Sequence, residues 1–366
     1  MRVQQRVTTR RTAGLPVYPL HVGQPSSSAP STVRAAAHAA LDGDLIAYTD
    51  ALGTAPLRDA IAGHYKTRYG LAVDPRSVGI TTGSSAAFQY AFLAAFEVGD
   101  TVAVTRPGYP AYRNTLLALG CEVVYLDCGA DVGYQPSVAM LEALSEPPAG
   151  LVLAGPANPT GTVTNAATLA GIAAWCAAKG TRLISDEIYH GLEYGEPAAS
   201  AWQTDRSSVV VNSFSKYFSM TGWRIGWMLL PDDLYDPVDR LAGNLALCPP
   251  TLSQLAAVAA FDATAELEAN LARYAANRGY LLDALPGIGI DRFAPPDGAF
   301  YIYADVSRWT DDSLSWCARL LDETGVALAP GIDFDPVDGD RFVRLCFAGD
   351  GAELATAIDL LGAWLS

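Results

Sequence analysis

The sequence lacks the features that mark several common classes of protein. Its six cysteines are few for 366 residues and lie far apart, so they form neither a zinc-binding pattern nor a disulfide framework. The four histidines show no ligand spacing, and no metal site is predicted. No apolar run approaches the roughly 18 residues that a membrane helix needs, so we expect no membrane partner.

Positive charge is scarce as well. Lysine and arginine number 24 against 39 acidic residues, which gives a formal net charge of −15. This balance argues against nucleic acid as a partner. The basic segment 1–11 lacks the apolar stretch of a signal peptide, and dispersed cysteines are simplest to explain in a reducing compartment. We therefore expect a cytoplasmic protein.

Apolar runs and helical patterns alternate along most of the chain, and half of all residues are hydrophobic. Strand-then-helix units are predicted at 101–105 and 111–119, at 123–126 and 138–144, and at 151–154 and 166–178, with further strands at 182–186, 209–213 and 225–230 and earlier helices at 32–41 and 54–69. Such alternation is typical of α/β proteins with a mostly parallel, doubly wound sheet. A long helical stretch at 252–285, with a possible break at 262–264, precedes a smaller α+β lobe over 299–365.

One lysine stands in an unusual segment, Ser213–Arg224, in which aromatic and hydroxyl side chains surround Lys216. Poor hydration there can hold the amine partly neutral and nucleophilic. Arg224 and the neighbouring serines could bind a phosphate group. An amine that condenses with an aldehyde beside a phosphate site indicates pyridoxal phosphate (PLP). Taken alone, Lys216 could equally be a surface lysine on a loop.

Two other segments place polar residues where predicted strands end. Asn158 lies in a loop rich in proline and glycine, where its amide could reach both a ring hydroxyl and a substrate carboxylate. Asp186 ends the strand at 182–186, and a buried carboxylate there would keep a pyridine nitrogen protonated. Tyr189 could donate to the ring oxygen. Taken separately, the first segment is an ordinary turn and the second an acidic strand end that faces solvent, an interpretation that suits Glu187.

In combination, these segments resemble the class I/II aminotransferases of the aspartate aminotransferase superfamily, which are fold-type I PLP enzymes. The resemblance rests on the order of Asn158, Asp186, Lys216 and Arg224 and covers residues 23–344. It implies that Lys216 is the Schiff-base lysine and that Asp186 pairs with the pyridinium nitrogen. It also implies that Tyr189 and Asn158 bind the ring oxygen of the cofactor.

The resemblance places the phosphate of the cofactor in two segments. Ser213 and Arg224 would hold it from one side. Gly83, Ser84 and Ser85 would cradle it from the turn before an apolar helix, where backbone N–H groups favour an anion. The same turn could also be a plain helix cap. Ser85 occupies a position where some aspartate-specific relatives carry a lysine, so an acidic substrate is less favoured.

Four further positions follow from the resemblance. Tyr109 would stack on the pyridine ring, Arg344 would bind the substrate carboxylate with Asn158, and Gly23 would belong to the substrate site. Tyr48 would reach the phosphate site of the other subunit of a homodimer. No residue identifies the substrate side chain, although those at 15–18, His21, Tyr112 and Trp223 could line the pocket.

The implied activity is transamination between an L-amino acid and a 2-oxo acid by a ping-pong mechanism, with Lys216 as general base at Cα. The same residues would serve a PLP-dependent lyase that carries out C–S β-elimination or a related elimination. A non-catalytic PLP-binding regulator is a more distant alternative, because the segment before Gly23 is too short for a DNA-binding domain. The resemblance also implies a large PLP-binding domain at 45–255 and a discontinuous small domain at 1–44 and 256–366.

Overall fold

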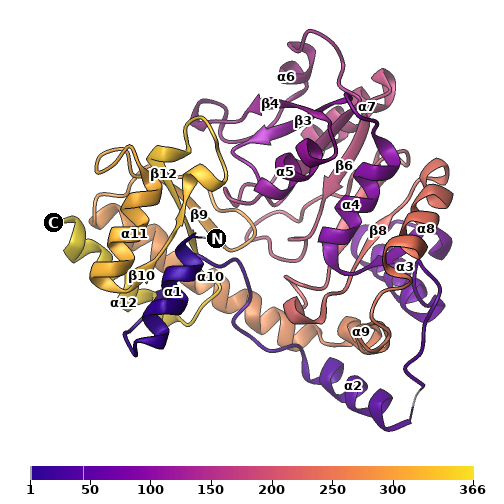
Figure 1. The fold of residues 1–366 in the computed structure, drawn as a ribbon, viewed down its shortest axis with the longest axis horizontal. Coiled ribbons are helices and arrows are strands. Elements are labelled where there is room, and N and C mark those ends of the chain that lie inside the picture. The colour runs from indigo at the N-terminus through magenta and orange to yellow at the C-terminus, as the bar shows by residue number, and fades with distance from the viewer. Residues whose placement is uncertain (1, 44) are drawn as a thin grey trace.

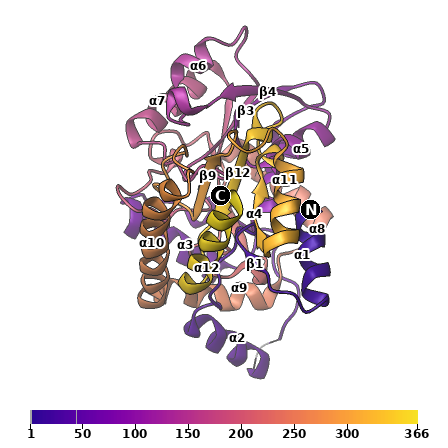
Figure 2. The ribbon, with the colours of Figure 1, turned by 90° about the vertical axis from the view of Figure 1, so that its left-hand side faces the viewer.

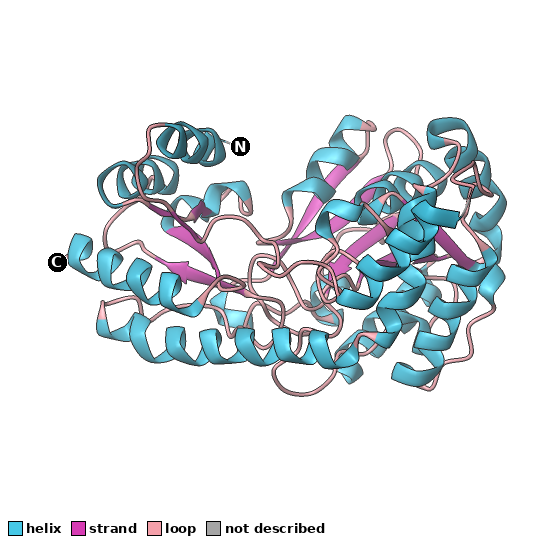
Figure 3. Ribbon diagram, turned by 90° about the horizontal axis from the view of Figure 1, so that it is seen from below, coloured by secondary structure: helices cyan, strands magenta, loops and turns pink. Residues whose placement is uncertain are grey.

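The protein has two lobes, one around a seven-stranded sheet and one around a three-stranded sheet (Figure 1). The structure, a computed structural model, describes residues 2–43 and 45–366. Helix α10 (Thr264–Gly287) runs along one side of the molecule from one lobe to the other (Figure 3). The chain ends both lie with the three-stranded lobe (Figure 2).

The larger sheet confirms the predicted α/β class. Its strand order is β2 (Val78–Thr81), β8 (Gly226–Leu229), β7 (Val209–Ser213), β6 (Arg182–Asp186), β5 (Gly150–Ala154), β3 (Thr101–Arg106) and β4 (Glu122–Asp127). Strand β8 runs antiparallel to both of its neighbours, and the remaining pairs are parallel. The carboxyl ends of the other six strands therefore lie at one edge of the sheet.

Helices cover both faces of this sheet, as the doubly wound prediction requires. Strand β7 shows the division, because Val209 and Val211 pack into one core cluster and Val210 into the other. The first cluster includes residues of α4 (Gly83–Ala95), α5 (Pro110–Ala118) and α8 (Asp232–Ala246), and the second includes residues of α3 (Ala55–Tyr69), α6 (Val138–Glu142) and α7 (Ala166–Lys179).

The smaller lobe contains an antiparallel sheet in the order β11 (Ala329–Pro330), β12 (Phe342–Cys346) and β9 (Tyr301–Asp305). Helices α11 (Ser313–Thr324) and α12 (Gly351–Leu365) belong to this lobe. Two N-terminal elements join it as well. Strand β1 (Tyr18–Pro19) pairs with β10 (Val326–Ala327), and α1 (Arg2–Thr12) lies against α11, where Arg6 binds Asp322 at 2.6 Å.

Helix α2 (Ser31–Gly43) lies at the other end of the molecule, against α9 (Thr251–Ala257) and the 3₁₀ segment Val258–Asp262. Thr32 donates a hydrogen bond to the carbonyl of Ala259 at 2.9 Å. The predicted break in the long helical stretch is confirmed, since α10 begins at Thr264. The domain limits at residues 44 and 255 stay a prediction. Among the described residues, no helix is long and apolar enough to cross a lipid bilayer.

Candidate active site

A cavity of about 300 Å³ lies between the two sheets, and most of the residues singled out by the sequence line it. These residues are Gly23, Ser84, Ser85, Tyr109, Asn158, Asp186, Tyr189, Lys216, Arg224 and Arg344. The wall is completed by Tyr112, Ile188, Ser215, Thr221 and Tyr301. Segments that are far apart in the sequence therefore meet in one place.

Sheet topology explains why these segments converge. Tyr109 follows β3, Asn158 follows β5, Asp186 ends β6 and Lys216 follows β7. These four strands are parallel, and ligands of open α/β sheets bind at the carboxyl ends of such strands. Arg344 reaches the same cavity from β12 of the smaller sheet. The cavity therefore takes its walls from both lobes.

One end of the cavity is suited to an anion. Helix α4 begins at Gly83 and directs its N-terminal N–H groups toward that end, where Ser84, Ser85 and Arg224 line the wall. Gly83 has φ +71°, and a Cβ added to it would lie 2.3 Å from a guanidinium nitrogen of Arg224. The left-handed backbone at this position favours glycine, and any larger residue would also displace the Arg224 guanidinium. Gly83 itself does not appear in the cavity wall.

Ser213 lies one layer behind the wall. Its hydroxyl donates to the Oγ of Ser215 at 2.9 Å, and Ser215 is the serine that lines the cavity. The arrangement orients Ser215 next to Lys216 and leaves Ser213 buried. A direct contact between Ser213 and a phosphate stays a prediction, while Ser215 and Thr221 are hydroxyl donors that the sequence reasoning did not assign individually.

Lys216 is held with its amine inside the cavity. The Nζ atom donates to the carbonyl of Gly23 at 2.6 Å and lies 5.7 Å from the ring centre of Tyr189. Burial lowers the pKa of Lys216 to about 8, and the nearby charge of Arg344 acts in the same direction. Near neutral pH the amine is therefore much closer to its neutral, nucleophilic form than an exposed lysine would be.

Asp186 is buried at the base of the cavity. Tyr112 donates to one carboxylate oxygen, and the backbone N–H of Ile188 donates to the other at 3.1 Å. Burial raises the pKa of Asp186 to about 6, because these two donors only partly replace water. A cation placed next to this carboxylate would favour its charged form.

The guanidinium group of Arg344 is held by two hydrogen bonds and two aromatic rings. It donates to the Oδ1 of Asn158 at 2.7 Å and to the carbonyl of His21 at 2.8 Å. The guanidinium carbon also lies 4.3 Å from the ring centre of Tyr301 and 4.6 Å from that of Phe334. Within the described residues, the buried Nε of Arg344 has no partner. The two aromatic rings thus hold the planar guanidinium group of Arg344 at the cavity wall.

Tyr48, like Gly83 and Ser213, is a predicted site residue that does not line the cavity of this subunit. Its side chain is 81% exposed, and it borders a separate hollow with Thr82, Ala246 and Cys248. Thr82 immediately precedes α4, so Tyr48 lies on the outer side of the anion-binding turn. The sequence reasoning also missed Tyr301 and Phe334, since no local pattern distinguishes them from core residues.

Comparison with solved structures identifies the class that this fold and cavity define. A crystal structure of an aminotransferase from Mycobacterium tuberculosis matches with a TM-score of 0.98 and 56% identity, covering 100% of this chain and 95% of that one. The aspartate aminotransferase of Thermus thermophilus with maleate matches with a TM-score of 0.92 and 28% identity over 99% of this chain and 95% of that one. The fold is that of the fold-type I aminotransferases.

Sequence comparison gives the family. The family described as aminotransferase class I and II matches residues 16–361. A valine–pyruvate aminotransferase of Mycobacterium tuberculosis is 58% identical over 350 residues (94% of this chain and 90% of that protein), and an aspartate aminotransferase of Thermotoga maritima is 30% identical over 357 residues (96% and 92%). The chain belongs to the class I and II aminotransferases. It is a PLP-dependent transaminase that moves an amino group between an amino acid and a 2-oxo acid.

Proposed function

We propose that this enzyme transfers the amino group between valine, or an amino acid with a similar small apolar side chain, and pyruvate. The observation that carries the proposal is the convergence of Lys216, Asp186 and Arg344 on one cavity. The 58% identity to a valine–pyruvate aminotransferase supports the choice of substrates.

The residues of the cavity fit the cofactor. The close contact between Gly83 and Arg224 and the hydroxyls of Ser84 and Ser85 suit a phosphate group, with Ser213 behind them. The buried carboxylate of Asp186 suits a protonated ring nitrogen. When bound, PLP supplies an aldehyde that condenses with an amine and a ring that accepts electrons from the substrate Cα.

We assign the remaining steps to residues of this chain. Lys216, once its amine is free, would act as the base that takes the proton from the substrate Cα onto its Nζ and as the acid that gives it back. Asn158 and Tyr189 would donate to the ring oxygen of the bound cofactor, and Tyr109 would cover one face of the ring. Arg344 binds the substrate carboxylate and so sets which bond of Cα faces Lys216.

The composition of the cavity wall favours an apolar substrate side chain. Among the described residues, the cationic groups of the wall are Lys216, Arg224 and Arg344, and each has a proposed role already. No other cation among the described wall residues would meet a second substrate carboxylate, and Ser85 occupies the position of the lysine found in some aspartate-specific relatives. Tyr112 and Ile188 add apolar surface to the wall.

A panel of amino acids tests the substrate proposal. We expect valine and alanine to discharge the visible absorbance of the bound cofactor rapidly, whereas aspartate should react about 100-fold more slowly because its second carboxylate would be desolvated without a partner. Single-turnover absorbance measurements give these rates. Equal rates for aspartate and valine would contradict the proposal. Ammonia release without a 2-oxo acid would instead indicate lyase chemistry.

We further propose that the active form is a homodimer. The hollow beside Tyr48 is lined by Ile46, Ala47 and the segment 248–251, and Ile46 and Tyr48 are both exposed. Leu45, Leu245 and Leu247, which flank lining residues in the sequence, are all more than half exposed. A large apolar patch on the surface favours burial against a second protein copy. Tyr48 would then reach the anion-binding turn of the partner subunit.

Substitution of Tyr48 tests this arrangement. Tyr48→Phe should leave the dimer intact and weaken cofactor binding about tenfold, since one hydrogen bond to a charged group is lost. Sedimentation equilibrium measures the mass, and titration of the cofactor-free protein with PLP measures affinity. Tyr280→Phe on α10, outside this patch, is the matched control and should change neither quantity. A monomeric wild-type protein or an unchanged affinity for PLP would refute the shared site.

We also propose a cytoplasmic location. All six cysteines carry free thiols, and five of the six are buried within the fold. Buried unpaired thiols are common in proteins that fold under reducing conditions. Fractionation of the native host cell, followed by an activity assay with valine and pyruvate, would test the location directly.

A further inference from the structure

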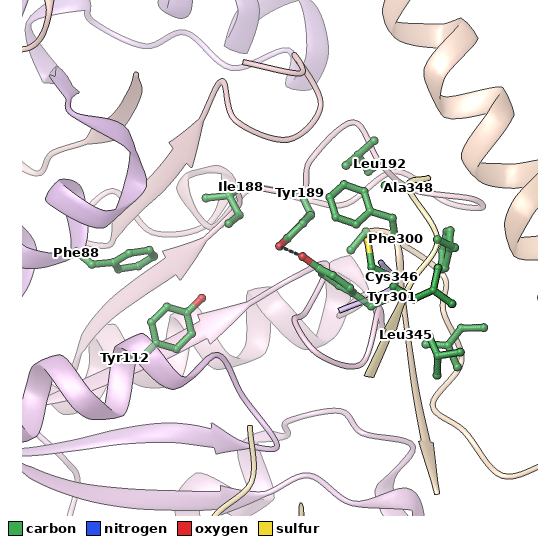
Figure 4. Close-up of a cluster of buried hydrophobic side chains, with 14 of the residues drawn as sticks. Phe88, Tyr112, Ile188, Tyr189, Leu192, Phe300, Tyr301, Leu345, Cys346 and Ala348 are labelled. Carbon is green, nitrogen blue, oxygen red and sulfur yellow. Dashed lines mark hydrogen bonds between the residues drawn. The ribbon is translucent and has the colours of Figure 1, made fainter. Parts of the chain in front are cut away.

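Tyr301 occupies a central place in the cavity that the proposed mechanism does not yet use. It is the first residue of β9, it is 1% exposed, and it lines the cavity between the two lobes. Its hydroxyl faces that of Tyr189, and the two oxygens lie 2.7 Å apart (Figure 4). Both side chains are buried, so the hydrogen bond between them is shielded from bulk water.

Three functional groups of the site meet around this one side chain. The hydroxyl of Tyr301 contacts Tyr189, and its ring lies against the guanidinium of Arg344 at 4.3 Å. A Cβ added to Gly23 would lie 1.9 Å from the Tyr301 oxygen. The carbonyl of Gly23 in turn accepts the hydrogen bond of Lys216. The position of Tyr301 therefore requires glycine at 23.

The number of hydroxyl protons fixes the direction of the hydrogen bond between Tyr189 and Tyr301 when the cofactor is present. A phenol has one proton to donate and can accept further bonds. If Tyr189 gives its proton to the ring oxygen of the cofactor, the bond between the two phenols must be donated by Tyr301. Burial raises the pKa of both phenols, so both keep their protons. Hydrogen bonds that are chained in a low-dielectric site strengthen one another.

We infer that Tyr301 is a positioning residue, whose hydroxyl donates to Tyr189 and thereby directs and strengthens the hydrogen bond from Tyr189 to the ring oxygen of the cofactor. The inference rests on the proposed role of Tyr189. Loss of the Tyr301 hydroxyl leaves the ring oxygen with a weaker donor. The ring oxygen then attracts a nearby proton more strongly, and the titration of the bound cofactor moves to higher pH.

The test is a pH titration of the visible absorbance of the resting holoenzyme. Tyr301→Phe keeps the ring beside Arg344 and removes only the hydroxyl, and we expect the midpoint to rise by about 0.5 pH unit. Tyr189→Phe should raise the midpoint further. Adding Tyr301→Phe to Tyr189→Phe should then produce no additional shift, because the first hydroxyl acts through the second. The KM for the amino acid should stay within about twofold of wild type, since Arg344 keeps its stacking partner.

Tyr303 offers a matched control on the same strand. It is also 1% exposed, and among the described residues its hydroxyl has no hydrogen-bond partner. Tyr303→Phe should therefore leave the titration unchanged. The inference is overturned if Tyr301→Phe titrates like the wild type, if Tyr303→Phe shifts the midpoint equally, or if the wild-type absorbance does not change with pH. Failure of the proposed function would look different, because it would appear as equal rates for aspartate and valine and would leave the pH titrations of these variants as expected.

Discussion

Replacing Lys216 with alanine is expected to abolish the visible absorbance of covalently bound cofactor and to lower turnover about 10⁴-fold or more, since the variant loses both the attachment point and the general base. The folded structure should persist, because the one hydrogen bond of the lysine goes to the carbonyl of Gly23. Absorbance spectra, steady-state rates and circular dichroism together give the three readouts. Full activity in this variant would remove Lys216 from the mechanism.

The lysine content of the chain provides unusually clean controls for this experiment. Lys66 and Lys179 are the other two lysines in the sequence, and both are exposed, on α3 and α7. Lys66→Ala and Lys179→Ala should keep the spectrum and the activity. Borohydride treatment of the PLP-loaded wild type should attach the cofactor to the peptide that contains Lys216. Attachment to either exposed lysine alone would contradict the proposed role.

Much of the larger lobe could be predicted because its strands and helices are defined by local patterns. The short apolar runs at 151–154 and 209–213 are typical of strands inside a sheet, and they form β5 and β7. The polar residues that follow them are placed by the parallel topology alone. Local strand patterns together with the parallel topology therefore account for the place of Asn158 and Lys216 in the cavity wall.

Two helices were missed for identifiable physical reasons. Helix α8 contains Pro237, a residue that usually breaks helices, yet Leu234, Val238 and Ala242 bury one face of it. Helix α1 has little apolar surface beyond Val3 and Val7, but both valines are buried in a core cluster that includes residues of α11. In both cases tertiary packing outweighs the local signal.

The aromatic residues around Arg344 could not be predicted for a related reason. Tyr301 begins β9 inside the predicted α+β lobe, and Phe334 follows a short 3₁₀ turn, so from the sequence either resembles an ordinary core residue. Their function arises only when the smaller sheet is placed against the larger one. Gly108 of the large lobe donates to the carbonyl of Phe334 at 3.1 Å, a contact between lobes that no local pattern indicates.

Arg344→Ala is expected to raise the KM for amino acids by about 100-fold or more, because two charge-assisted hydrogen bonds to the substrate carboxylate are lost. The substitution also leaves the Oδ1 of Asn158 and the carbonyl of His21 without a donor. Arg344→Lys should recover little, since an ammonium group cannot form the planar fork or occupy the space between Tyr301 and Phe334. The KM for the 2-oxo acid should rise in parallel, as both substrates carry the same carboxylate.

Arg341 is the matched control for this change. It lies three residues earlier, is exposed, and binds Asp338 in its own lobe, outside the cavity wall. Arg341→Ala should leave the KM for both substrates and the cofactor spectrum unchanged. Steady-state kinetics with valine and pyruvate, together with the absorbance of bound cofactor, separate loss of substrate binding from loss of the cofactor. An unchanged KM in Arg344→Ala would show that another group binds the carboxylate. The Nε of Arg344, which has no partner among the described residues of the wild-type protein, would then not serve the substrate carboxylate.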